Sequence, residues 1–175
     1  MKQLILIRHG KPEPTGTGKP DALRELTPAG RAALAAPTGF EATFTELLAD
    51  AEGAGLDLAP DGQAIALWTS PAVRAHQTAD EARAALERLG RGVSAPVEHT
   101  SLWEQDDAAF LAELAQAQAT SIVACGHIPF MNRICTWLTG DEVAFTPGAA
   151  ALIVLPDEVA EGAAALISFI DGPAV

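Results

Sequence analysis

The stretch LILIRHG at residues 4–10 joins a short apolar run directly to Arg8, His9 and Gly10. A run of this length is typical of a buried strand, and residues 2–7 are predicted to form one. Ligands of open α/β sheets bind just beyond the carboxyl ends of such strands. The stretch therefore places a guanidinium and an imidazole where these folds carry out chemistry, and Gly10 leaves room for a turn and a ligand.

Strand and helix patterns alternate along the rest of the chain. Helices are predicted to begin at the N-cap signatures Thr27-Pro28 and Ser70-Pro71. This alternation predicts an α/β three-layer sandwich, with a mostly parallel central sheet and helices on both faces. The last two strands have no helix between them and are expected to form an antiparallel hairpin at one edge. Residues 1–175 are expected to form one domain. The other predicted strands are at 64–68, 93–98, 121–125, 149–155 and 163–170, and the other helices at 40–51, 106–118 and 129–138.

Composition restricts the classes of partner. The chain has 175 residues and a formal net charge of −12, which argues against a nucleic-acid or anionic-membrane surface. Any phosphate site must therefore be a local positive pocket. The only cysteines, Cys125 and Cys135, are predicted to be free buried thiols. Together with the lack of a signal peptide or a membrane-spanning run, they lead us to expect a cytoplasmic protein.

Two further strand ends carry polar residues. In WTSPAVRAHQTA, residues 68–79, a strand leads into a helix with Arg74 in its first turn. Backbone N–H groups at a helix start favour an anion, whose oxygens an arginine can bind. In VACGHIP, residues 123–129, a buried strand ends in Gly126-His127. Either residue alone could be structural, but a second strand-end histidine in a chain with four histidines points to a shared site.

An acidic segment, LWEQDD at residues 102–107, is predicted to lie in a loop between a strand and a helix. Glu104 is the first candidate for a general acid, and Asp106 is the second. Asp106 or Asp107 could instead stabilise the N-terminus of the helix. Trp103 is the aromatic residue that we expect to contact a substrate.

The motifs together resemble the histidine phosphatase superfamily, also called the phosphoglycerate mutase-like family. The resemblance rests on Arg8-His9-Gly10, TPAG at 27–30, SPAVRAHQT at 70–78 and Gly126-His127, in that order. The length and FTPGA at 145–149 make the chain most similar to the short bacterial phosphohistidine phosphatases. The resemblance implies that His9 is the nucleophile and that Arg8, Arg74 and His127 bind the phosphoryl group.

The predicted activity is hydrolysis of a phosphate monoester or phosphoramidate through a phosphohistidine on His9, without metal or other cofactor. To attack phosphorus, His9 must be neutral, and its other ring nitrogen is expected to donate to a carbonyl near Gly10. The expected partner is a small phosphorylated metabolite or a phosphohistidine-bearing protein. The oligomeric state is left open.

Other functions stay open as alternatives. Residues 11–16 contain no Asn, unlike many mutases of this superfamily, so a phosphoglycerate mutase-type phosphotransferase is a weaker candidate than a hydrolase. A non-catalytic phosphate-binding module would share the fold. A metal hydrolase using His9, His127, Glu104 and Asp106 is disfavoured by the neighbouring arginines. A cysteine phosphatase is excluded, because Met131 stands where the arginine after Cys125 would have to be.

Overall fold

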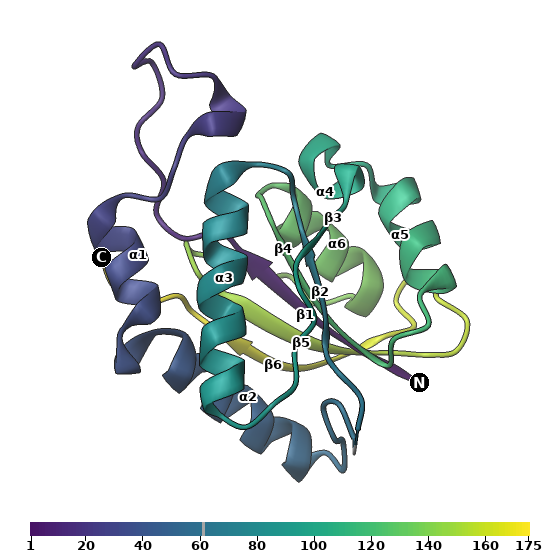
Figure 1. Cartoon of the computed structure of the whole chain (residues 1–175). Helices are drawn as coiled ribbons and strands as arrows, with labels where there is room; N and C mark the ends of the chain where they lie inside the picture. The colour runs from purple at the N-terminus through teal and green to yellow at the C-terminus, as the bar shows by residue number, and fades with distance from the viewer. Residues whose placement is uncertain (61) are drawn as a thin grey trace.

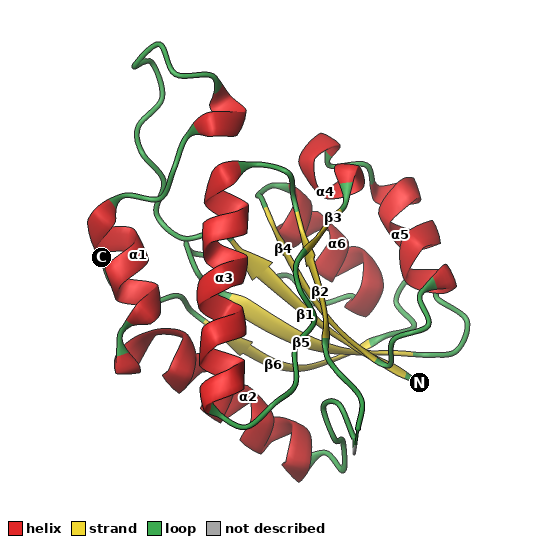
Figure 2. Cartoon of the chain, viewed as in Figure 1, coloured by secondary structure: helices red, strands yellow, loops and turns green. Residues whose placement is uncertain are grey.

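A central sheet with helices on both faces organises the chain (Figures 1 and 2). The computed structural model describes residues 1–60 and 62–175. The strands are β1 (Lys2–Arg8), β2 (Ala66–Thr69), β3 (Val97–Glu98), β4 (Ser121–Gly126), β5 (Ala150–Leu155) and β6 (Ala165–Ile170). The helices are α1 (Pro28–Ala35), α2 (Ala42–Gly53), α3 (Val73–Arg88), α4 (Thr100–Glu104), α5 (Asp107–Gln116) and α6 (Phe130–Thr139), with short helical turns η1 (Asp21–Leu23) and η2 (Pro37–Glu41).

The strand order is β3-β2-β4-β1-β5-β6. Strands β3, β2, β4 and β1 run parallel to one another, whereas β5 and β6 are antiparallel to their neighbours. The predicted mostly parallel sheet and the predicted C-terminal hairpin are both confirmed. The parallel strands all end at the same edge of the sheet, so the residues that follow β1, β2 and β4 meet there.

The alternation of side chains along β1 builds two cores. Ile5 and Ile7 pack on the face covered by α1, α2 and α3, and Leu4 and Leu6 pack on the face covered by α4, α5 and α6 (Figure 1). All four side chains are fully buried. A run that is apolar at every position is what a strand covered on both faces requires.

Two sequence predictions were wrong in detail, and one short helix was missed. Helix α3 does not begin at Ser70-Pro71, because Ala72 is its N-cap residue and the Ser70 backbone N–H donates to Cys125 O at 3.0 Å, which extends the sheet. The strand predicted at 93–98 is reduced to Val97–Glu98 and one bridge at Val93, since Pro96 lacks an N–H for the ladder. Helix α4 was not predicted.

The segment between β1 and α1 leaves the sheet at the carboxyl ends of the parallel strands. It projects beyond them as a loop that contains η1 (Figure 1). The loop is tied at its base by backbone hydrogen bonds from Thr27 to Lys11 O at 2.9 Å and from Glu13 to Glu25 O at 2.8 Å. In the described part of the chain no helix is both long and apolar enough to cross a membrane.

Candidate active site

Neighbouring parallel strands bring the two strand-end histidines together. Arg8 pairs with Gly126 in the register of β1 and β4, and each strand is followed directly by a histidine. The backbone N–H of His9 donates to Gly126 O at 2.9 Å. As a result, the rings of His9 and His127 lie with centroids 5.1 Å apart, although 118 residues separate them in the sequence.

The tautomer of His9 is fixed by its own loop. Its Nδ1 lies 2.7 Å from Gly10 O, as predicted. A carbonyl can only accept, so Nδ1 carries the hydrogen and Nε2 has the free electron pair. Burial lowers the pKa of His9 to about 3, and the nearby His127, Arg74 and Arg8 act in the same direction, although the Gly10 contact opposes it. His9 is therefore a neutral imidazole at neutral pH.

Arg74 reaches the nucleophile candidate from the first turn of α3. Its side chain is buried, and its Nε donates to His9 Nε2 at 3.4 Å. The guanidinium carbon also lies 5.8 Å from the centre of the Trp103 ring. Arg74 is thus placed to bind an oxygen of a group attached to that nitrogen.

His127 is held by the loop that follows β2. Its Nε2 lies 2.8 Å from Ser70 Oγ, and its ring meets Trp103 edge-on at 5.5 Å between centroids. Burial lowers the pKa of His127 to about 4, and Arg74 contributes in the same direction. The free side chain is therefore a neutral hydrogen-bond donor or acceptor, and an incoming anion would raise its pKa.

Arg8 presents an unused donor. Its Nη1 donates to Phe145 O at 2.8 Å, which anchors the guanidinium. Among the described residues, its Nε is the one buried side-chain nitrogen or oxygen that lacks a hydrogen-bond partner. A buried polar group without a partner is costly, so an unused N–H beside a cavity favours an acceptor such as a phosphoryl oxygen.

A cavity of about 520 Å³ collects these groups. The described residues that line it are Arg8, His9, Pro12, Asp21, Arg24, Arg74, Trp103, Gln105, His127 and Ile128. A second cavity of about 580 Å³, beside α2 and the loop after it, has no imidazole among its described lining residues. Of these two cavities, as far as the described residues line them, the first combines imidazoles with guanidiniums, the groups that phosphoryl transfer needs.

Solved structures match the fold over nearly the whole chain. The protein histidine phosphatase SixA, solved with tungstate, is 20% identical, with a TM-score of 0.65 over 97% of this chain and 96% of its own. The chain has the histidine phosphatase fold. A protein described as the phosphohistidine phosphatase SixA of Agrobacterium tumefaciens gives the same identity and TM-score, over 97% of each chain.

The histidine phosphatase fold also occurs in a phosphoserine phosphatase from Entamoeba histolytica, solved with phosphoserine. That protein is 17% identical, with a TM-score of 0.60 over 97% of this chain and 96% of its own. No protein-family model matches the sequence, and no curated protein sequence matches it significantly. The fold is therefore shared among phosphatases whose described substrates differ.

The structure does not bring Glu104 into the cavity. Glu104 is exposed at the end of α4, while its neighbours Trp103 and Gln105 line the cavity wall. Gln105, at φ 55°, turns the chain out of α4 in a left-handed conformation. Asp106 is the N-cap of α5, where its side chain accepts from the Ala109 N–H at 3.1 Å. Asp106 was considered either as a general acid or as a helix cap, and the structure shows it as a helix cap.

The metal-hydrolase alternative needs Glu104 and Asp106 as ligands beside the two histidines. Neither acid is part of the cavity wall formed by the described residues. Three guanidiniums, those of Arg8, Arg24 and Arg74, line that wall instead. Such a wall favours anions and opposes cations.

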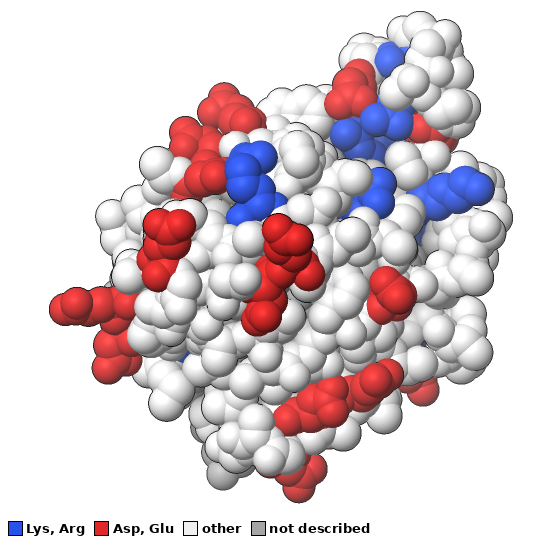
Figure 3. Space-filling view, turned by 180° about the vertical axis from the view of Figure 1, so that it is seen from behind, with Lys and Arg blue, Asp and Glu red and all other residues white. Residues whose placement is uncertain are grey.

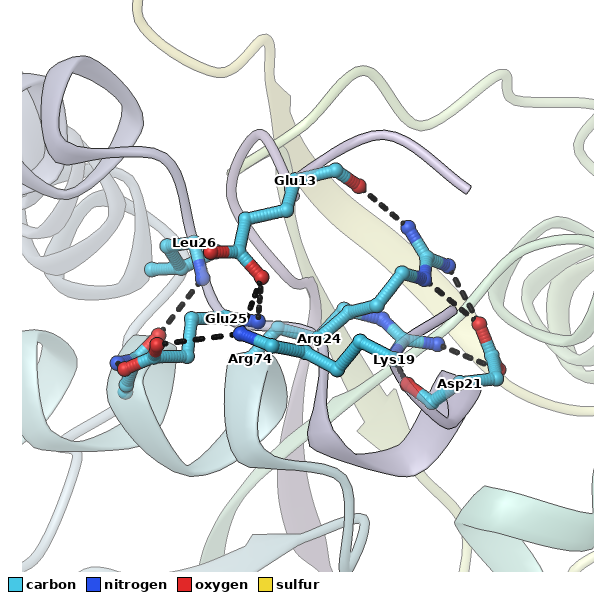
Figure 4. Close-up of polar contacts among 8 residues, drawn as sticks. Glu13, Lys19, Asp21, Arg24, Glu25, Leu26 and Arg74 are labelled. Carbon is cyan, nitrogen blue, oxygen red and sulfur yellow. Dashed lines mark hydrogen bonds and ion pairs between the residues drawn. The ribbon is translucent and has the colours of Figure 1, made fainter. Parts of the chain in front are cut away.

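Sequence reasoning missed Asp21. It lies on η1 and contributes its carboxylate to the cavity between Arg24 and Arg74 (Figure 4). The Asp21–Arg24 pair, three residues apart, was a signal that could have been used, because such a spacing joins opposite charges across one helical turn. It would not have identified Arg74 as the second partner, because that contact spans 53 residues.

Proposed function

We propose that this protein is a phosphatase in which Nε2 of His9 takes the phosphoryl group from the substrate and water then releases it. The observation that carries the proposal is the free electron pair of His9 Nε2, turned toward Arg74 in a cavity shared with Arg8 and His127. These four residues come from three separate segments of the chain. A phosphoryl group in the cavity would meet a nucleophile and several positive or neutral donors together.

The reaction proceeds in two displacements. In the first, His9 Nε2 forms a bond to phosphorus while the bond from phosphorus to the leaving oxygen or nitrogen breaks. A leaving alkoxide takes a proton from water, whereas a protonated phosphohistidine leaves as neutral imidazole. In the second, water attacks the phosphohistidine, the P–N bond breaks, and His9 returns to its neutral form as inorganic phosphate and a proton are released. Arg8 and Arg74 stabilise the charge on the equatorial phosphoryl oxygens in both steps.

The leaving group points to the substrate class. Of the described residues that line the cavity, the only carboxylic acid is Asp21, and Arg24 and Arg74 hold its pKa below the usual range, against the effect of burial. Asp21 is therefore ionised and a poor proton donor. An alkoxide needs a proton as it leaves, whereas a phosphohistidine that is protonated on its other ring nitrogen releases a neutral imidazole, whose conjugate acid has a pKa of about 6.5. We therefore propose a phosphohistidine-bearing protein or another phosphoramidate as the substrate.

The proposal is tested with His9→Ala. The wild-type protein is expected to hydrolyse para-nitrophenyl phosphate and phosphoramidate, and to show an acid-labile, base-stable label after brief exposure to a labelled phosphohistidine. His9→Ala is expected to lose both the turnover and the label, because it removes the ring nitrogen that lies beside Nε of Arg74.

The matched control is His76→Ala. This histidine lies on α3 two residues from Arg74, but its Nε2 pairs with Glu98 at the surface at 2.8 Å. It should keep both the turnover and the label. Label on His9→Ala, or phosphate binding without turnover in the wild type, would contradict the proposal; the second outcome would instead support a docking module.

A further inference from the structure

The guanidinium of Arg74 is already occupied by an internal anion. Its Nη1 donates to the backbone oxygen of Asp21 at 2.7 Å, and its Nη2 donates to Asp21 Oδ2 at 3.2 Å. Its Nε faces His9. Each nitrogen of the group therefore has an acceptor within the protein, and a phosphoryl oxygen can reach the outer edge of Arg74 only where Asp21 now lies.

Asp21 is carried by a loop that is braced from outside the cavity. Arg24 binds Asp21 Oδ1 through Nε at 2.8 Å and Nη2 at 2.7 Å, and its Nη1 donates to Glu13 O at 2.7 Å (Figure 4). The carboxylate thus binds two guanidiniums. Its contact with Arg24 can persist when its contact with Arg74 breaks.

The two partners differ in exposure. The side chain of Asp21 is 54% exposed, whereas that of Arg74 is 5% exposed. The carboxylate of Asp21 can therefore be solvated by water when it leaves, whereas the buried guanidinium of Arg74 needs another acceptor in its place. A phosphoryl oxygen is such an acceptor, so release of Asp21 is favourable when the ligand enters.

The negative charge of Asp21 affects how an anionic ligand binds at Arg74. The cavity holds three guanidiniums and one carboxylate, while His9 and His127 are neutral at pH 7 because burial lowers both pKa values. A phosphoryl dianion bound at the Arg74 edge would lie beside Asp21, and the like charges would repel. The dianion and the carboxylate therefore compete for the same donors.

We propose that Asp21 is an internal competitor of the phosphoryl group: it occupies Arg74 in the free protein, gives way to the substrate, and returns to expel inorganic phosphate. This inference rests on the proposed phosphatase function and adds a residue that sets affinity and product release. It also assigns a role to η1, which positions the carboxylate at the mouth of the cavity.

The test measures the binding of inorganic phosphate to the wild type and to Asp21→Asn by calorimetry, together with product inhibition by phosphate during turnover of para-nitrophenyl phosphate. Without the competing charge, phosphate is expected to bind about tenfold more tightly or better, since a hydrogen bond to a charged group is worth roughly that factor. Product inhibition is expected to strengthen by the same factor. Asp21→Ser serves as a second variant, and thermal unfolding checks that both fold.

Glu25→Gln is the matched control, because it removes one negative charge from the same loop without touching Arg74. Glu25 contacts Lys19 and Gln77 instead. Glu25→Gln should bind phosphate as the wild type does. If this variant bound phosphate as much more tightly as the Asp21 variants do, net charge alone would explain the effect, and the inference would be overturned. Unchanged or weaker phosphate binding by both Asp21 variants, with turnover retained, would overturn the inference while the phosphatase function stands. A wild type that neither binds nor releases phosphate would overturn the function itself.

Discussion

The arginines at the candidate site have different surroundings and therefore different expected roles. Arg8 is anchored through Nη1 to a backbone oxygen and keeps Nε free, so it forms a fixed wall of the phosphoryl site. Arg74 contacts both His9 and Asp21, so it links the proposed nucleophile to the carboxylate at the mouth of the cavity. Planar donor groups of this kind fit phosphoryl oxygens in pairs, which an ammonium group cannot do.

Arg74→Ala should lower kcat/KM by about two to three orders of magnitude, the usual effect of losing one preorganised donor to the transition state. Arg74→Lys should recover only part of this loss, because it restores the charge but not the planar pair of donors. Arg83→Ala, an exposed arginine on α3 that pairs with Glu87, is the control and should keep full activity. A loss of tenfold or less in Arg74→Ala would remove that residue from the proposed mechanism.

The two histidines of the cavity should resist protonation. Burial lowers the pKa of His9 to about 3 and that of His127 to about 4. Ring resonances in a nuclear magnetic resonance titration should therefore stay those of neutral imidazoles from pH 8 down to pH 5. Because the rings are close together, the protons are expected to bind to the pair in coupled steps. Protonation of either ring near pH 6.5 in the free protein would show that its site is open to water.

At the scale of the elements, the sequence predicts the central strands β1, β4 and β5 well, because each is a mostly buried apolar run. Continuous apolar runs gave β1 and β4, and the glycine and histidine after each run gave the site. Contacts formed across the fold could not be predicted in this way. Glu104 was expected in a loop, because the five residues of α4 are too short to show a helical period.

The signatures Thr27-Pro28 and Ser70-Pro71 look alike but behave differently. Thr27 caps α1, accepting from the Gly30 N–H through Oγ1 at 2.9 Å. Ser70 lies 2.8 Å from His127 Nε2, and α3 begins three residues later. The difference is set by the partner that the sheet brings to Ser70, which local sequence does not contain.

This difference predicts that one alanine variant loses stability and the other loses activity. Thr27→Ala should lower the free energy of unfolding by about 1 kcal/mol, as loss of an N-cap does, with little change in kcat/KM. Ser70→Ala should lower kcat/KM, because His127 loses the contact that orients its ring. Urea unfolding and steady-state kinetics of both variants provide the check. Full activity of Ser70→Ala would show that His127 does not need the Ser70 contact for its function.

At the scale of the whole molecule, a positive site lies in an acidic protein. The net charge is −12, and on the face shown in Figure 3 most Lys and Arg atoms lie toward the end that carries the loop before α1, whereas Asp and Glu atoms are spread over the whole face, that end included. We expect the long-range repulsion of anions to be overcome at the cavity, where three guanidiniums come within contact distance of a bound anion.

The buried histidines also make the stability of the whole molecule depend on pH. In the unfolded chain their pKa is about 6.5, and in the fold it falls to about 3 for His9 and about 4 for His127. Below about pH 6.5 the unfolded chain therefore binds protons that the fold does not, so acidification favours unfolding. Each histidine should lower the free energy of unfolding by up to about 1.4 kcal/mol per pH unit until the pH approaches its folded value. Urea unfolding of the wild type between pH 7.5 and 5 should show this decline, and the double variant His9→Gln, His127→Gln should show a shallower one. Equal slopes in the two proteins would mean that neither imidazole is kept neutral by burial.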